Sequence, residues 1–300
     1  MTATTRAAAP AAEPSPRRVP ARRPTSVRHA TRQGVKGVLV ALLLGFTLFP
    51  VLWMLSSAFD AQAGGSGQTL IPREWTLEHF AFVLDEGGFG TYLRNSAIVA
   101  LATVVVAGLV ALLASVAVAR FQFRLRTTLV MLILVVQMIP LEALVIPLFV
   151  QVRDLQLLGQ LLGLVIVYVA LSLPFGIWML RGFVAAVPKE LEEAAYLDGA
   201  SWWRMFRSVL LPLVMPGLVA TSVFSFITAW NEFLFAMTLL QGERGSYTVA
   251  IGLKQFFGEY SNLWGPIMAA STLLTLPVMI FFVIVQRRLS SGLVAGAVKG

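Results

Sequence analysis

Long apolar runs separated by short polar segments dominate the pattern of this chain. Each run is close to or longer than the ~20 residues that an α-helix needs to cross a bilayer, and none shows the two-residue alternation of a barrel strand. Backbone groups in hydrocarbon must be paired within the protein, so helices are the expected spanning elements. The pattern predicts an all-α polytopic membrane protein with six transmembrane helices, over residues 36–58, 93–119, 127–150, 161–181, 211–240 and 263–285.

The overall composition supports a lipid environment. Hydrophobic residues make up 57% of the 300 residues and charged residues only 13%. This leaves too little polar surface to cover a water-soluble globule of that length. The apolar runs are therefore interpreted as membrane spans and not as buried helices of a soluble core.

The basic residues are distributed unevenly between the two sets of loops. Eighteen of the 23 Lys and Arg residues lie near the two termini or beside the loops that follow the second and fourth predicted helices. Loops rich in Lys and Arg stay in the cytoplasm, so both termini are expected there. Residues 1–33 are basic, rich in Pro and Ala, and free of aromatic residues. This composition predicts a disordered cytoplasmic tail and argues against nucleic-acid binding.

Several kinds of chemistry are missing from the sequence. The chain has no Cys, and its two histidines, His29 and His79, fall in unrelated segments. There is no G-x-x-x-x-G-K-[ST] loop, which would bind nucleotide phosphates. We therefore expect no catalytic residue, no metal site and no cofactor bound by this chain, which is not an enzyme by itself.

A charged segment over residues 188–212 interrupts the apolar pattern on the predicted cytoplasmic side. Its acidic residues Glu190, Glu192 and Glu193 suit the first turn of a helix, and Asp198-Gly199 predicts a turn that ends this helix. Ser201 can cap a second helix, before Pro212 marks the return to the membrane. In the first helix, Leu191, Ala194 and Ala195 are predicted to form one exposed docking face.

The residues of this segment resemble the EAA motif of ABC importer permeases. The matching spacing is Glu-Ala-Ala, three residues, Gly, nine residues, Val, one residue and Leu-Pro. The family usually has Ile at the position of Val209, a change of one methylene. The resemblance implies that the segment docks into a cleft of an ATPase subunit, through Glu193, Ala194, Ala195, Asp198, Gly199, Leu211 and Pro212.

Two further segments are similar to the maltose-type carbohydrate permeases of this family. They are Trp230-Asn231-Glu232-Phe233-Leu234 and the end of the chain, over residues 292–300. The resemblance implies a permease domain over residues 34–300 that imports a di- or oligosaccharide by alternating access in a prokaryotic cell membrane. The implied partners are two ATPase subunits, which use ATP and Mg²⁺, a second homologous permease and an extracytoplasmic solute-binding protein, which the loop 241–262 would meet.

Two carboxyl groups fall inside predicted spans, Glu142 in the third and Glu232 in the fifth. A carboxylate in hydrocarbon costs several kcal/mol unless it is paired, wetted or protonated. Both are therefore expected either to face the substrate pathway, together with Trp230 and Asn231, or to be polar staples at a subunit interface. For Trp230 and Asn231 the alternative is plain packing against a neighbouring helix.

Two other classes of function fit parts of the sequence. A secondary transporter or channel that works alone could use Glu142 and Glu232 as proton or ion sites. A membrane scaffold without transport could use residues 188–212 as a partner-binding loop. Stimulation of transport by ATP and a binding protein would separate these classes from an ABC permease.

Overall fold

Helices form the regular structure of this chain, as the apolar pattern predicts. The computed structural model describes residues 26–65, 70–258 and 262–297, and within these ranges it contains no strand, only two isolated bridges. The all-α prediction is confirmed. The elements are α1 (Ser26–Ala58), α2 (Glu78–Asp85), α3 (Phe89–Arg120), α4 (Arg126–Val136), η1 (Leu141–Leu144), α5 (Val145–Asp154), α6 (Leu161–Ala186), α7 (Lys189–Leu197), α8 (Trp202–Met205), η2 (Phe206–Leu210), α9 (Leu211–Asn231), α10 (Leu234–Leu239), η3 (Arg244–Ser246), α11 (Val249–Lys254) and α12 (Trp264–Ala297).

The chain forms two compact units, and the boundary between them follows residue 50, inside α1. The described part of the first unit is a single helix that begins at Ser26. Residues 1–25 of the predicted disordered tail lie outside the described residues, but residues 26–33 are helical and not disordered as predicted. A helix can extend past the apolar run here because this stretch, from Ser26 to Gln33, contains neither Pro nor Gly.

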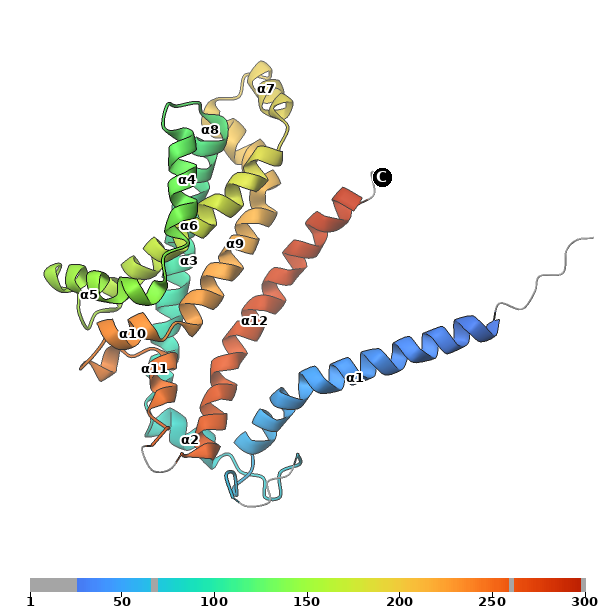
Figure 1. The fold of residues 1–300 in the computed structure, drawn as a ribbon, viewed down its shortest axis with the longest axis vertical. Coiled ribbons are helices and arrows are strands. Elements are labelled where there is room, and N and C mark those ends of the chain that lie inside the picture. Colours follow the sequence, from blue (N-terminus) through green and yellow to red (C-terminus); the bar gives the residue numbers. More distant parts are fainter. Residues whose placement is uncertain (1–25, 66–69, 259–261, 298–300) are drawn as a thin grey trace, which may run out of the picture. The chain divides into compact units, whose positions relative to one another are not determined.

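The second unit is built around three helices that pack along one another, α3, α6 and α9 (Figure 1). Helix α12 packs against α9 and α2. Small residues allow close approach: a Cβ added to Gly176 of α6 would lie 3.1 Å from the Cβ of Ala111 in α3. Small residues at such contacts are typical of membrane helices, because association in lipid depends on close packing. These three helices form the frame that positions the site.

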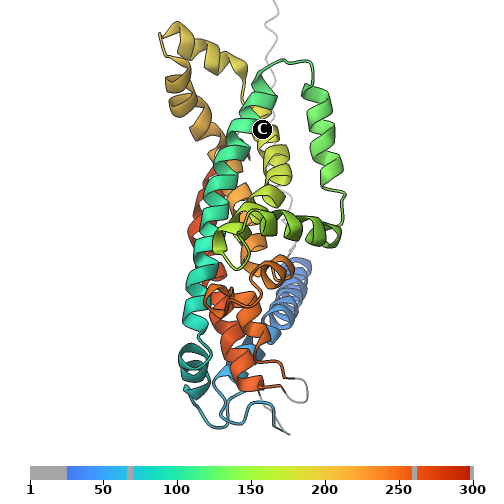
Figure 2. The ribbon, with the colours of Figure 1, turned by 90° about the vertical axis from the view of Figure 1, so that its left-hand side faces the viewer.

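Five described helical stretches are long and apolar enough to cross a membrane, by length and composition: 33–58, 89–120, 161–186, 202–231 and 264–286. The third predicted span is different. The third predicted span, 127–150, is sharply bent, because α4 and the segment Leu141–Asp154 meet at 99° (Figure 2). Pro140 has an extended backbone (ψ 127°) and lacks the N–H that would continue the helix. If this bent pair is one span, the total is six.

The fifth predicted span, 211–240, is also not one helix. Its helix begins earlier, since α8, η2 and α9 together run from Trp202 to Asn231. It ends at Glu232, which has an extended backbone (φ −68°, ψ 127°), and a separate helix, α10, follows. The carboxyl group of Glu232 stabilises the break by accepting hydrogen bonds from the first turn of α10.

Gly217 provides a direct test of the α6–α9 contact. A Cβ added there would lie 2.4 Å from the Cγ and 2.9 Å from the Cβ of Phe183. We expect Gly217→Ala to lower the Tm of the purified protein by roughly 4–8 °C, because overpacking costs about 1–3 kcal/mol. The matched control is Gly182→Ala, whose added Cβ would have no neighbour within 4 Å. Equal melting of both variants would contradict the close contact.

Candidate functional site

The predicted docking segment forms a helical hairpin at one end of the α3–α6–α9 frame (Figure 1). Helix α7 ends in a Schellman motif, in which the N–H of Ala200 donates to the carbonyl of Ala195 and that of Gly199 to Tyr196, both at 3.0 Å. Gly199 has φ +79°, a left-handed conformation that favours glycine. The hydroxyl of Ser201 accepts the N–H of Arg204 and caps α8, as predicted. Helix, turn and cap are therefore confirmed.

The two faces of α7 differ from the predicted arrangement in one residue. Leu191, Glu193 and Ala194 are exposed, and Leu197 is 90% exposed. Ala195, predicted on the same face as Leu191 and Ala194, instead packs against the buried cluster that contains Leu180, Met205 and Leu210. The exposed face presents apolar side chains beside a carboxylate, a combination that suits docking to another protein.

The inner face of α7 is held by an ion pair that sequence reasoning missed. The Nε of Arg120 donates to Oε1 of Glu192 at 2.7 Å, and the two side chains are 10% and 12% exposed. The Nη2 of Arg120 also donates to the carbonyl of Val187 at 2.9 Å, where α6 ends. One guanidinium thus ties the end of α3 to the corner between α6 and α7. The available signal was a basic residue that ends an apolar helix, but its partner is 72 residues away.

The Glu232 carboxyl group links the break between α9 and α10 to α6. It accepts the hydroxyl of Tyr168 at 2.5 Å and the backbone N–H groups of Phe235 and Ala236 at 2.9 and 3.0 Å. The two backbone donors belong to the first turn of α10, so the side chain satisfies groups that lack partners within the helix. Sequence reasoning missed Tyr168 as the partner. The carboxyl group is a polar staple between elements of this same chain.

The other residues assigned to the substrate pathway fall in different environments. Trp230 is 2% exposed, stacks on Phe226 and donates its indole N–H to the carbonyl of Leu274 at 3.1 Å. Asn231 is exposed and donates to the carbonyl of Ile227 at 2.9 Å. Glu142 is exposed in η1, at the corner between α4 and α5. Their part in a substrate pathway stays a prediction.

The segment over residues 244–254, which contains η3 and α11, is anchored to the beginning of α3. The amide nitrogen of Asn95 donates to the carbonyls of Gly245 and Tyr247 at 2.8 and 3.0 Å. The hydroxyl of Ser96 accepts the N–H of Val249 at 2.9 Å. Both polar side chains are buried. The predicted loop 241–262 is therefore not a free connector in its described part, and its anchors were missed because they lie about 150 residues earlier.

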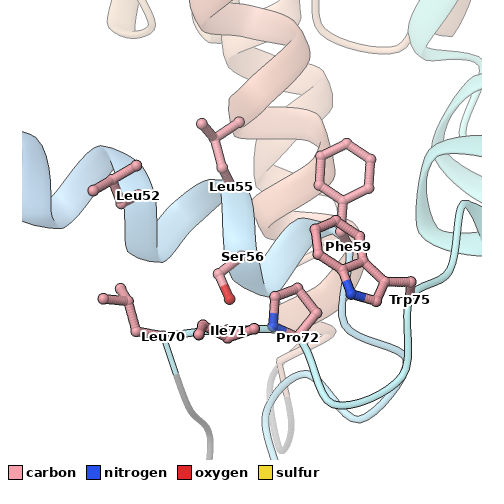
Figure 3. Close-up of a pocket in the computed structure, with 8 residues that line it drawn as sticks. All are labelled: Leu52, Leu55, Ser56, Phe59, Leu70, Ile71, Pro72 and Trp75. Carbon is pink, nitrogen blue, oxygen red and sulfur yellow. The ribbon is translucent and has the colours of Figure 1, made fainter.

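A pocket of about 340 Å³ lies between the end of α1 and the segment that follows it (Figure 3). Its lining is almost wholly apolar and contains no titratable side chain, so it does not suit a polar sugar, which needs several hydrogen-bonding groups. The pocket is lined by Leu52, Leu55, Ser56, Phe59, Leu70, Ile71, Pro72 and Trp75.

No group of three or more His, Cys, Asp or Glu in the described ranges could hold a metal ion.

The helical frame, the broken spans and the hairpin of α7 and α8 are the features of a class, the polytopic membrane permeases. The family described as "Binding-protein-dependent transport system inner membrane component" matches residues 107–294. The chain belongs to this family, and it is a membrane permease subunit of a binding-protein-dependent ABC importer.

Curated relatives match almost the whole chain. The diacetylchitobiose uptake system permease protein DasC of Streptomyces coelicolor is 43% identical over 263 residues, which are 87% of this chain and 95% of the relative. The trehalose transport system permease protein SugB of Mycobacterium tuberculosis is 34% identical and covers 90% of this chain and 99% of its own. The trehalose/maltose permease protein MalG of Thermococcus litoralis is 35% identical and covers 89% and 95%.

A solved structure has the same fold. A chain of a bacterial ABC transporter involved in the import of the acidic polysaccharide alginate superimposes with a TM-score of 0.74. The match covers 87% of this chain and 98% of that chain, at 23% identity. This similarity confirms the predicted permease fold.

Proposed function

We propose that this permease moves a di- or oligosaccharide into the cytoplasm. The observation that carries the proposal is the identity of 34–43% to permeases named for the uptake of diacetylchitobiose, trehalose and maltose, over 87–90% of the chain. The Trp230–Leu234 segment and residues 292–300 add to this support, since both resemble carbohydrate permeases.

The proposed partner proteins are inferred from the exposed surfaces of the permease and from its lack of a nucleotide-binding loop. The sequence has no nucleotide-binding loop, so ATP and Mg²⁺ are used by two ATPase subunits, and the exposed face of α7 docks on one of them. A second, homologous permease completes the pathway, and an extracytoplasmic binding protein delivers the sugar to the outer loops. Both termini lie in the cytoplasm of a prokaryotic cell, because the basic residues gather on that side.

Of the four residues assigned to the pathway, the two exposed ones contact the substrate. The two packed ones hold the backbone that positions this contact. Asn231 and Glu142 present polar side chains that can bond sugar hydroxyls. Trp230 and Glu232 hold the α9–α10 break at which Asn231 lies. The transport cycle is alternating access, in which closure of the ATPase pair moves α7 and turns the permease pair outward.

Reconstitution of the complete importer in lipid vesicles tests this function. We expect uptake of a labelled oligosaccharide only when the binding protein is outside and ATP is inside. Diacetylchitobiose, trehalose and maltose are the first substrates to compare. Uptake by the permease alone, driven by an ion gradient, would instead establish a secondary transporter. Absence of any transport, with the partners bound, would favour a scaffold.

Reversing the charge at Glu193 tests the docking face. We expect Glu193→Lys to lower co-purification of the ATPase at least about fivefold, because a like-charge contact at an interface costs ~1 kcal/mol or more. The matched control is Glu190→Lys, which makes the same change in the exposed first turn of α7 but outside the EAA motif. Equal recovery of the ATPase with both variants would count against docking through Glu193.

A further inference from the structure

Helix α3 differs from the other long helices of the described residues in having no internal proline. Pro50, Pro174, Pro216 and Pro277 lie inside α1, α6, α9 and α12, whereas the 32 residues of α3 contain none. Proline removes a backbone hydrogen bond and kinks a helix, so α3 lacks the cause of bending that the other long helices contain.

Both ends of α3 are fixed to segments that face outside partners. At one end Arg120 bonds to Glu192 on α7 and to the carbonyl of Val187. At the other end Asn95 bonds to the carbonyls of Gly245 and Tyr247. Asn95 is 2% exposed, and the side chains of Arg120 and Glu192 are 10% and 12% exposed, so loss of a partner would leave a costly unpaired polar group at either end. The two anchors are 25 residues apart, which is about 38 Å of helix.

The middle of α3 contacts its neighbouring helices by packing and not by hydrogen bonds. It packs on α6 and α9 through small residues, among them Ala111 against Gly176. The hydroxyl of Thr103, which lies between the anchors, is buried and has no hydrogen-bond partner. The hydrogen bonds that α3 makes to α7 and to segment 244–254 therefore lie near its two ends.

We propose that α3 is a rigid rod that makes α7 and the outer segment 244–254 move as one body, with Arg120 and Asn95 as the positioning residues at its two ends. The proposal rests on the proposed function, because an ATPase would load one end and a binding protein the other. Arrival of the binding protein at segment 244–254 then repositions α7 directly, without passing through the kinked helices.

The rod is tested first on the full-length permease in lipid vesicles, without its partners. The chain has no Cys, so Leu197→Cys and Glu243→Cys provide two unique sites for spin labels, one beside each end. We expect one narrow distance distribution between the labels. Asn95→Leu and Arg120→Gln should each broaden it about twofold, since each releases one end of α3. Thr103→Val, which alters the same helix between the anchors, should leave the width unchanged. Unchanged widths for both anchor variants would overturn the rod.

The second test uses the assembled importer and measures the ratio of binding-protein-stimulated to basal ATP hydrolysis. Asn95→Leu and Arg120→Gln should each lower this ratio about tenfold, and the double variant should also lose about tenfold, because both act on one element. Losses that multiply to about a hundredfold would overturn the proposal. If Asn95→Leu does not assemble, Ser96→Ala removes the neighbouring anchor, and a loss of about threefold is expected. An unaltered ratio for Ser96→Ala would contradict the rod.

These two tests separate the rod from the proposed function. If no binding protein stimulated ATP hydrolysis by the wild-type importer, the proposed function would be refuted. The widths of the label–label distance distributions would still show whether α3 acts as a rod. Intact stimulation, combined with unchanged widths of the label–label distance distribution in both anchor variants, would refute the rod alone.

Discussion

Replacing Gly199 by valine is expected to lower ATP-driven uptake at least about tenfold while the amount of permease in the membrane stays the same. Gly199 has φ +79°, and no atom would lie within 4 Å of an added Cβ. The cost of the substitution therefore comes from the backbone alone. The left-handed region costs ~1–2 kcal/mol for an ordinary residue, and a β-branched residue is an outlier there. A tenfold loss corresponds to about 1.4 kcal/mol.

The reason for a loss of coupling, and not of folding, is the position of Gly199. The residue closes the end of α7, and the two Schellman bonds, donated by Gly199 and Ala200, set the direction in which the chain enters α8. A changed turn would displace the exposed face of α7 and leave the α3–α6–α9 frame intact. ATP hydrolysis by the assembled importer should continue without uptake, which is measured by comparing both rates in vesicles.

The matched control at this position is Gly199→Asn. Asparagine tolerates the left-handed region better than other residues with a side chain, and the open space around Gly199 accommodates it. We expect this variant to retain most of the uptake. Normal uptake by Gly199→Val, or equal losses in both variants, would show that the left-handed turn is not what couples hydrolysis to transport.

Replacing Glu232 by alanine is expected to lower the Tm of the purified permease by roughly 6–12 °C. The substitution removes the acceptor for three donors, one from Tyr168 and two from the first turn of α10. A buried donor without a partner costs about 1–3 kcal/mol, and for a chain of this size each kcal/mol shifts Tm by ~2–4 °C. The α9–α10 break should lose its fixed geometry, so uptake should fall as well.

Two milder variants show which contact matters. Tyr168→Phe leaves the carboxyl group bonded to α10 and should lower Tm by about a third as much, because one of the three donors is lost. Glu232→Gln retains an acceptor for the backbone and should lie between the wild type and alanine. If Glu232→Gln instead abolished transport at unchanged Tm, the carboxyl group would act as an ion or proton site, as in a secondary transporter.

The spans show how far local sequence can predict this fold. Hydropathy located each apolar run, because a helix in lipid has to be apolar along its length. It did not separate α4 from α5 or α9 from α10, because one or two polar residues at a break lower the mean hydropathy of a whole window only slightly. The causes of the breaks were visible as single residues, Pro140 and Glu232. Only the structure shows that the chain turns by 99° at the first and starts a new helix after the second.

The candidate site was predicted where its geometry is local. The turn at Gly199 and the cap at Ser201 depend on residues within five positions, and both are present. Glu192 was predicted only as a dipole-compensating residue of the first turn, yet its partner is Arg120. Ala195 was assigned to the exposed face because helical spacing allows it there, although packing against the α8–α9 base turns it inward.

By itself the sequence determined the class of protein, the approximate spans and the hairpin of α7 and α8, because hydrophobicity, turn preference and a spaced motif all act within a few residues. The tertiary structure decided which polar groups meet: Arg120 with Glu192, Tyr168 with Glu232, and Asn95 with segment 244–254. These pairs are 64 to about 150 residues apart. In surroundings poor in water each such group requires a partner, but only the packing of helices determines which partner lies within hydrogen-bonding distance.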